Sequence, residues 1–144
     1  MHTALEEARR AAERGETPVG AVIYDPNSQS IIAQDGNRVR ELSDPTAHAE
    51  CLVIRKAAAE LSNERLQGFD LYVTLEPCPM CAGIISAARV SRLYYGASDP
   101  KSGGVEQGPC LFSHPQAHHK PEIYPGICED EAALLLREFF ASRR

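Results

Sequence analysis

The chain has 144 residues, of which 43% are hydrophobic and 24% charged, and its formal net charge is −5. These figures fit a single globular domain over residues 1–144 and exclude a disordered or low-complexity chain. The opening MHTALEEARRAAERG carries charge throughout, and no apolar run is long enough for a membrane span. We therefore expect a cytoplasmic protein with no membrane partner. The acidic balance counts against an RNA role unless positive side chains gather in one patch.

Apolar spacing and turn signals predict helices and strands that alternate along the chain. In chain order we expect a helix at 3–14, strands at 19–24 and 31–34, a helix from 47, a strand at 70–75, a helix at 79–88, a strand at 92–95, a short strand from 123 and a helix at 129–143. The turn at 25–28 joins the first two strands as a hairpin. The helix at 79–88 makes the strands on either side of it parallel neighbours. The fold class is α/β, with three α/β/α layers around a mixed sheet of about five strands.

Five cysteines and no visible export signal argue against a disulfide framework. Two of them lie in the segment LEPCPMC, as Cys78 and Cys81. A redox pair would be expected near the start of a thioredoxin-like unit, whereas this pair comes late and encloses Pro79. A metal site is the favoured use of the pair.

A third ligand and an acid–base group are expected upstream, at the start of the preceding helix. His48 with Cys78 and Cys81 makes three ligands for Zn²⁺, and three protein ligands leave a position for water, as in catalytic sites. Helix N-termini favour the thiolates. Glu50, two residues after His48, is placed to take a proton from the activated water and carry it to a substrate.

The combination His-x-Glu and Pro-Cys-x-x-Cys is the signature of zinc nucleobase deaminases. The chain also resembles the bacterial tRNA-specific adenosine deaminases almost from end to end. The landmarks are TPVGAVI, GNR at 36–38, TAHAE at 46–50, LYVTLEPCPMCAG at 71–83, YYGASDPKSG at 94–103, HP at 114–115 and the ending FFASRR.

The resemblance implies a cytidine-deaminase-like fold, with His48, Cys78 and Cys81 as ligands of one zinc ion per subunit and Glu50 as proton shuttle. It also implies that Asn37 hydrogen-bonds the flipped nucleotide and that Asp99 and Lys101 lie near the substrate entrance. The implied reaction is deamination of adenosine to inosine at the wobble position of an arginine tRNA. The implied assembly is a homodimer that binds the anticodon stem-loop across both subunits.

Several residues keep two interpretations. Cys51 is either a fourth metal ligand or, as free cysteine usually is, a small core residue. Asp99 either serves the substrate or caps a turn with Pro100. Phe139 is expected in the core, while Phe140 beside it is the candidate for stacking on a base. The positive residues considered for an RNA-binding face are Arg38, Arg40, Lys101, His118, His119, Lys120, Arg143 and Arg144.

Two other functions remain open at this point. A deaminase of a free base or nucleoside, of the guanine or cytosine type, would share the zinc, the glutamate and the fold, and it suits the acidic charge better. A structural zinc module would instead close its site with a fourth ligand such as Cys51.

Overall fold

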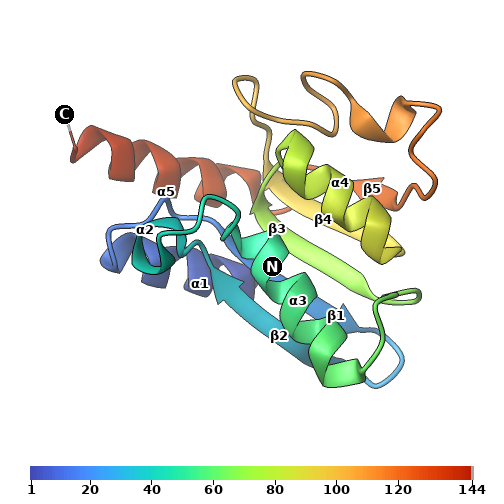
Figure 1. Ribbon diagram of the computed structural model, residues 1–144. Coiled ribbons are helices and arrows are strands. Elements are labelled where there is room, and N and C mark those ends of the chain that lie inside the picture. The colour runs from blue at the N-terminus through green and yellow to red at the C-terminus, as the bar shows by residue number, and fades with distance from the viewer. Residues whose placement is uncertain (144) are drawn as a thin grey trace.

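A mixed sheet of five strands forms the centre of the molecule in this computed structural model, which describes residues 1–143. The strands are β1 (Gly20–Asp25), β2 (Ser30–Gly36), β3 (Asp70–Leu75), β4 (Arg92–Ala97) and β5 (Glu122–Tyr124), in the order β2-β1-β3-β4-β5. β1 runs antiparallel to β2 and β3, while β3, β4 and β5 are parallel (Figure 1). The predicted hairpin, the parallel pair and the five-stranded mixed sheet are confirmed.

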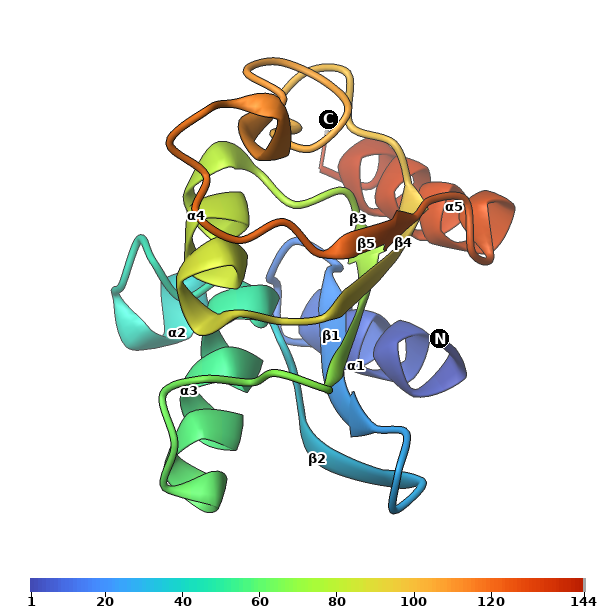
Figure 2. The same cartoon turned by 90° about the vertical axis from the view of Figure 1, so that its right-hand side faces the viewer.

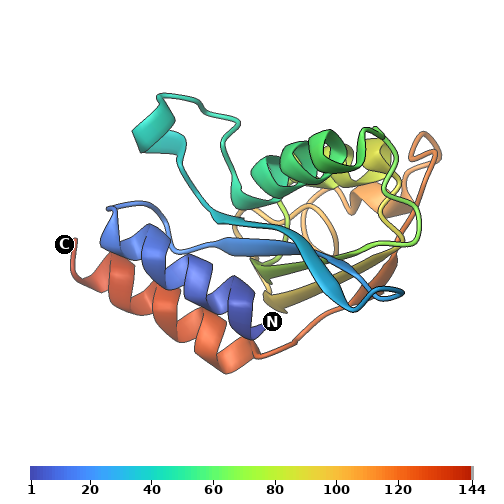
Figure 3. The ribbon, with the colours of Figure 1, turned by 90° about the horizontal axis from the view of Figure 1, so that it is seen from below.

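Helices cover both faces of the sheet, which confirms the three-layer prediction (Figure 2). α3 (Ala49–Leu61) and α4 (Pro79–Ala88) lie on one face, and α1 (His2–Glu13) and α5 (Glu129–Ala141) lie side by side on the other (Figure 3). Two short helices were not predicted, α2 (Val39–Leu42) and η1 (Leu111–Ser113). Over residues 1–143, no helix is both long and apolar enough to cross a membrane.

The main hydrophobic core lies between the sheet and the helices α3 and α4. Ile23, Leu71 and Leu93 from the strands pack with Val53 of α3 and Ile85 of α4, and all five side chains are fully buried. Burying side chains of this size stabilises a fold by about 1.5–3 kcal/mol each. This packing fixes the two helices against the sheet and so determines where their first residues lie.

Fewer buried hydrophobic side chains lie together on the opposite face of the sheet. Leu5 of α1, Ala97 of β4 and Ala132 of α5 form a separate small cluster there. α1 crosses β1 so closely that a Cβ on Gly20 would lie 1.9 Å from the Ala4 carbonyl oxygen. Only glycine fits at this crossing.

A row of four tyrosines runs across this same face, because residues alternate between the two faces along each strand. Tyr72 and Tyr94 are paired in the β3–β4 register, and Tyr94 is paired with Tyr124 of β5. The Tyr72 and Tyr94 rings stack with centroids 4.4 Å apart, and the Tyr94 and Tyr124 rings stack at 4.8 Å. Tyr24 of β1 meets Tyr72 edge to face at 6.3 Å. The aromatic row therefore links β1, β3, β4 and the edge strand β5.

Candidate active site

Three potential metal ligands meet where α3 and α4 begin. His48 immediately precedes α3 and Cys78 immediately precedes α4, each in an extended backbone conformation, while Cys81 lies in the first turn of α4. His48 Nδ1 is 3.7 Å from Cys78 Sγ and 3.5 Å from Cys81 Sγ, and all three ligand atoms lie within 4.8 Å of one another. Tetrahedral zinc with ordinary Zn–S and Zn–N bonds separates such atoms by about 3.6 Å. The donor set and its spacing therefore fit zinc.

The surroundings of these ligands favour negative charge on sulfur. A hydrogen bond from the Cys81 thiol, with further help from His48, lowers the pKa of Cys78 to about 4. The same bond raises the pKa of Cys81, since Cys81 holds the proton that the two sulfurs share. The Cys78 sulfur in turn raises the pKa of His48. A divalent cation bound between these groups would release the shared proton.

Glu50 lies in the first turn of α3, and its side chain is only 4% exposed. Burial raises the pKa of this carboxyl group, because a charged carboxylate loses its hydration there. Glu50 also lines the same cavity as His48 and Cys78. It is a buried carboxyl group beside the metal ligands without belonging to the ligand group itself. This is the arrangement that an acid–base group requires.

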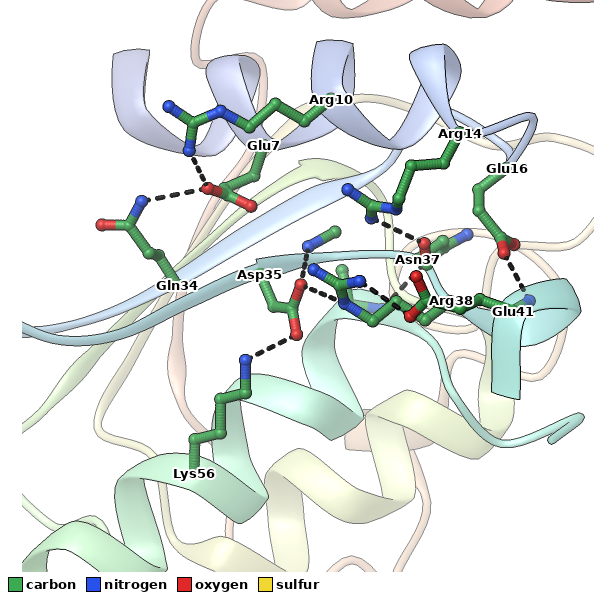
Figure 4. A network of polar contacts seen from close by, with 12 residues as sticks. Glu7, Arg10, Arg14, Glu16, Gln34, Asp35, Asn37, Arg38, Glu41 and Lys56 are labelled. Carbon is green, nitrogen blue, oxygen red and sulfur yellow. Dashed lines mark hydrogen bonds and ion pairs between the residues drawn. The ribbon is translucent and has the colours of Figure 1, made fainter. Parts of the chain in front are cut away.

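Asn37 is held at the end of β2 by three contacts. Its side-chain Oδ1 accepts a hydrogen bond of 2.8 Å from the Ala49 N–H, at the start of α3. Its backbone carbonyl accepts a bond of 3.0 Å from Arg14 (Figure 4). Its N–H donates to the Val19 carbonyl at 3.1 Å. Because Oδ1 must be the atom that faces the Ala49 N–H, the amide nitrogen remains for a ligand in the cavity that Asn37 lines.

Two overlapping cavities surround these residues. The inner cavity, of about 550 Å³, is lined by His48, Cys78 and Glu50. The outer cavity, of about 760 Å³, shares Asp99, Ser102 and Arg143 with the inner one and extends to Lys101 and Phe140. Of the site residues expected from the sequence, all but the fully buried Cys81 line one of these two cavities. An inner cavity of this volume falls in the range of ordinary small-molecule sites.

Asp99 and the two phenylalanines of α5, Phe139 and Phe140, lie near the opening. Asp99 Oδ1 accepts the N–H groups of Lys101 and Ser102, so its carboxylate caps its own turn while also lining both cavities. Phe139 was expected in the core, and this expectation is wrong. It is half-buried in the wall of the inner cavity, and the Arg143 guanidinium lies 4.3 Å above its ring. Phe140 is 49% exposed beside the outer cavity.

The positive residues do not all lie together. Arg40 and Arg143 line the inner cavity, and Lys101 lines the outer one. Arg38 is paired with Asp35 and Glu41 instead. His118 lines a separate cavity beside α4, and the ring of its neighbour His119 contacts the Val90 carbonyl oxygen. Arg144 lies outside the described residues.

Cys51 is a buried residue of α3 and does not belong to the ligand group. The core interpretation of this cysteine is the one that the geometry supports. Within the described part of the chain, the group offers three protein ligands and not the four that a closed structural site would need.

Two buried carboxylates near the opening, Glu16 and Glu76, were not predicted from the sequence to have a role in the site. Glu16, 2% exposed, accepts the N–H groups of Arg40 and Glu41 at the start of α2. Glu76, also 2% exposed, lies at the end of β3. Burial acts to raise the pKa of Glu76, but hydrogen bonds from backbone N–H groups of a distant loop outweigh it, and the net pKa is lowered. Neither residue type nor spacing marks such a role in a sequence.

An α/β domain that places a buried glutamate beside a His-Cys-Cys group, at the wall of a cavity, defines a zinc-dependent deaminase. The model of the cytidine and deoxycytidylate deaminase zinc-binding region matches residues 1–97. The tRNA-specific adenosine deaminase of Agrobacterium fabrum is 57% identical over all 144 residues and 93% of its own length.

Solved structures agree with this class. A tRNA:A34 deaminase studied for A-to-I editing at the wobble position is 57% identical, with a TM-score of 0.92 over 94% of this chain and 97% of that one. The guanine deaminase of Nitrosomonas europaea is 25% identical, with a TM-score of 0.78 over 97% of this chain and 82% of that one. The chain belongs to the cytidine and deoxycytidylate deaminase family and, within it, to the bacterial tRNA-specific adenosine deaminases.

Proposed function

We propose that this protein deaminates adenosine to inosine by hydrolysis at the wobble position of a tRNA anticodon, in an arginine tRNA. The observation that carries the proposal is the buried Glu50 beside the three-ligand group, in a chain 57% identical to a tRNA-specific adenosine deaminase. An adenine in an anticodon loop is already partly unstacked, so turning it into the inner cavity costs less than it would in a duplex.

The proposed chemistry assigns separate tasks to the metal ligands, to Glu50 and to Asn37. Zinc bound by His48, Cys78 and Cys81 would supply Lewis-acid activation of a water molecule. Glu50 accepts one proton from that water and delivers it to adenine N1; it then takes the second proton, from the hydroxyl now on C6, and passes it to the departing amino group as the C6–N bond breaks. Adenosine and water give inosine and ammonia, so the carboxyl group ends in its starting state. The Asn37 amide nitrogen donates to the nucleotide and orients it, because its oxygen is already held by the Ala49 N–H.

The outer cavity would receive the nucleotides that flank the target. Phe140 offers an exposed ring for stacking, and Lys101 and Arg143 offer positive charge for phosphates. A free nucleoside would fill the inner cavity and leave these groups unused. These positive side chains at the opening thus allow phosphate binding, although the net charge of the chain is negative.

We further propose one zinc ion per subunit, a homodimer and a cytoplasmic location, which rest on the family. Metal analysis of the purified protein should give one zinc per chain, and light scattering should give about twice the chain mass. Two zinc ions per chain, or a monomer that is fully active, would contradict these assignments.

The test is inosine formation in an anticodon stem-loop that carries adenosine at the wobble position. Free adenosine, guanine and cytosine are assayed beside it, together with the same stem-loop carrying guanosine at that position. We expect inosine in the first stem-loop and no reaction of the other substrates. Ammonia from a free base, with both stem-loops unchanged, would keep the zinc chemistry and overturn the RNA substrate.

A further inference from the structure

Glu76 stands between two segments that are far apart in the sequence. It follows β3 and comes two residues before the ligand Cys78. The loop of residues 98–107 follows the neighbouring parallel strand β4, so the two segments leave the same edge of the sheet. The Glu76 N–H donates to the Ala97 carbonyl at 2.8 Å and brings the start of that loop alongside.

Both carboxylate oxygens of Glu76 accept hydrogen bonds from the loop. Oε1 accepts the Asp99 N–H at 3.0 Å and the Ser98 hydroxyl at 3.3 Å. Oε2 accepts three successive N–H groups, at distances of 2.9–3.1 Å, from Val105, Glu106 and Gln107. Successive backbone N–H groups of this kind form an anion-binding nest, and here the anion is a side chain of the same protein. Across residues 1–143, no Lys, Arg or His forms an ion pair with Glu76. Its negative charge is therefore stabilised by the dipoles of backbone N–H groups.

The loop closes tightly around this carboxylate. A Cβ on Gly103 would lie 2.5 Å from Glu76 Oε2, and a Cβ on Gly104 would lie 2.5 Å from the Pro79 nitrogen. The Gly104 N–H donates to the Pro77 carbonyl at 2.8 Å, next to Cys78. The loop is therefore seated directly on the segment that carries the metal ligands.

The same loop supplies Asp99, Lys101 and Ser102 to the outer cavity. We infer that Glu76 is a positioning residue that holds the 98–107 loop in the conformation which admits the anticodon stem-loop. This inference rests on the proposed function. This positioning role requires a carboxylate, which has two acceptor oxygens. A glutamine has only one, so its NH₂ group would face N–H donors in place of either Oε1 or Oε2.

The experiment compares Glu76→Gln with the wild-type zinc-loaded protein by hydrogen–deuterium exchange and by stem-loop kinetics. We expect faster exchange confined to 98–107, unchanged zinc content, a KM for the stem-loop raised about tenfold or more, and kcat within about threefold. A partly unfolded or metal-depleted variant would instead lose kcat with KM unchanged, because only the concentration of active enzyme falls. An unchanged KM in a folded, zinc-loaded variant, or unchanged exchange in 98–107, overturns the inference.

Two further variants separate the contact from a general loss of stability. Glu16→Gln makes the same change at another buried carboxylate, and its faster exchange should fall at 38–43 and leave 98–107 protected. Gly103→Ala presses on Glu76 Oε2, and on the Asp99 carbonyl oxygen at 2.6 Å, without changing any charge, and it should reproduce the KM effect even if Glu76→Gln does not fold. A normal KM in Gly103→Ala refutes the positioning role. If the wild-type protein leaves the stem-loop unreacted, the proposed function fails, while the exchange results still decide whether Glu76 holds the loop.

Discussion

Replacing Asp35 by asparagine should destabilise the protein by about 2.5 kcal/mol. Asp35 is 2% exposed and accepts hydrogen bonds from Arg38 Nε at 2.8 Å, Lys56 Nζ at 2.7 Å and the Gly36 N–H at 2.8 Å (Figure 4). Gly36 and Arg38 both bond to Oδ1, so asparagine can keep an oxygen for these two donors, but it then turns its NH₂ group toward the Lys56 ammonium. Leaving this buried NH₂ group without an acceptor costs about 1–3 kcal/mol, and the bond to Arg38 is weakened because its acceptor is no longer charged. The half-exposed Lys56 adds about 0.2–1 kcal/mol.

The assay is urea denaturation of the zinc-loaded protein, followed by far-UV circular dichroism at several pH values. A loss of this size should also lower Tm by about 8 °C. Glu41→Gln is the matched control, because it removes only the exposed pair with Arg38 and should cost no more than about 0.5 kcal/mol. Equal losses in the two variants would refute the reasoning, since burial would then carry no weight.

The pH dependence gives a second check on Asp35. Burial acts to raise the pKa of this carboxyl group, but hydrogen bonds from Lys56, Arg38 and the Gly36 N–H outweigh it and lower the pKa. A lowered folded pKa means that the charge of Asp35 stabilises the fold above the unfolded pKa of about 3.9 and ceases to do so as pH falls through the folded value. The difference between wild type and Asp35→Asn should therefore be full at pH 7 and shrink below about pH 4. A difference that is constant from pH 7 to pH 3 would show that ionisation is not its source.

Three predictions concern the site. Glu50→Ala should retain zinc and lose about a thousandfold or more in kcat, whereas loss of zinc from a folded variant would mean that Glu50 is a ligand. Lys101→Ala should reduce the salt dependence of stem-loop binding by about one unit of log–log slope, while Lys120→Ala, outside both cavities, should leave the slope unchanged. Phe140→Ala should weaken binding by about 1–3 kcal/mol, a roughly 5- to 150-fold rise in Kd, and the equally exposed Leu134→Ala should not; similar effects of the two would exclude stacking.

The metal ligands could be predicted from the sequence because each of them lies at the start of a helix. Cys78 and Cys81 lie within one helical turn, and both they and His48 follow recognisable helix-start signals. The fold was predictable for a similar reason, since hairpin and helix-crossover signals determine most strand neighbours. α2 was missed because four residues are too few to show a helical period.

Contacts between distant segments were not predictable. Glu16 and Glu76 look like surface charges in the sequence because their partners are backbone N–H groups, which every residue but proline carries. Phe139 follows the apolar stripe of α5, but Ala132 is the one fully buried residue of that helix within the described chain. The later turns of α5 extend past the sheet (Figure 1), so the same stripe borders the cavity there.

The tyrosine row gives this protein an internal optical reporter. The sequence has no tryptophan and five tyrosines, four of which form the row. Stacked rings couple their electronic transitions, so the near-ultraviolet circular dichroism should be dominated by Tyr72, Tyr94 and Tyr124. This signal follows tertiary packing of the sheet, including attachment of its edge strand β5. It arises on the face opposite α3 and α4, so changes at the catalytic opening can be made while the integrity of the sheet is read from the spectrum alone.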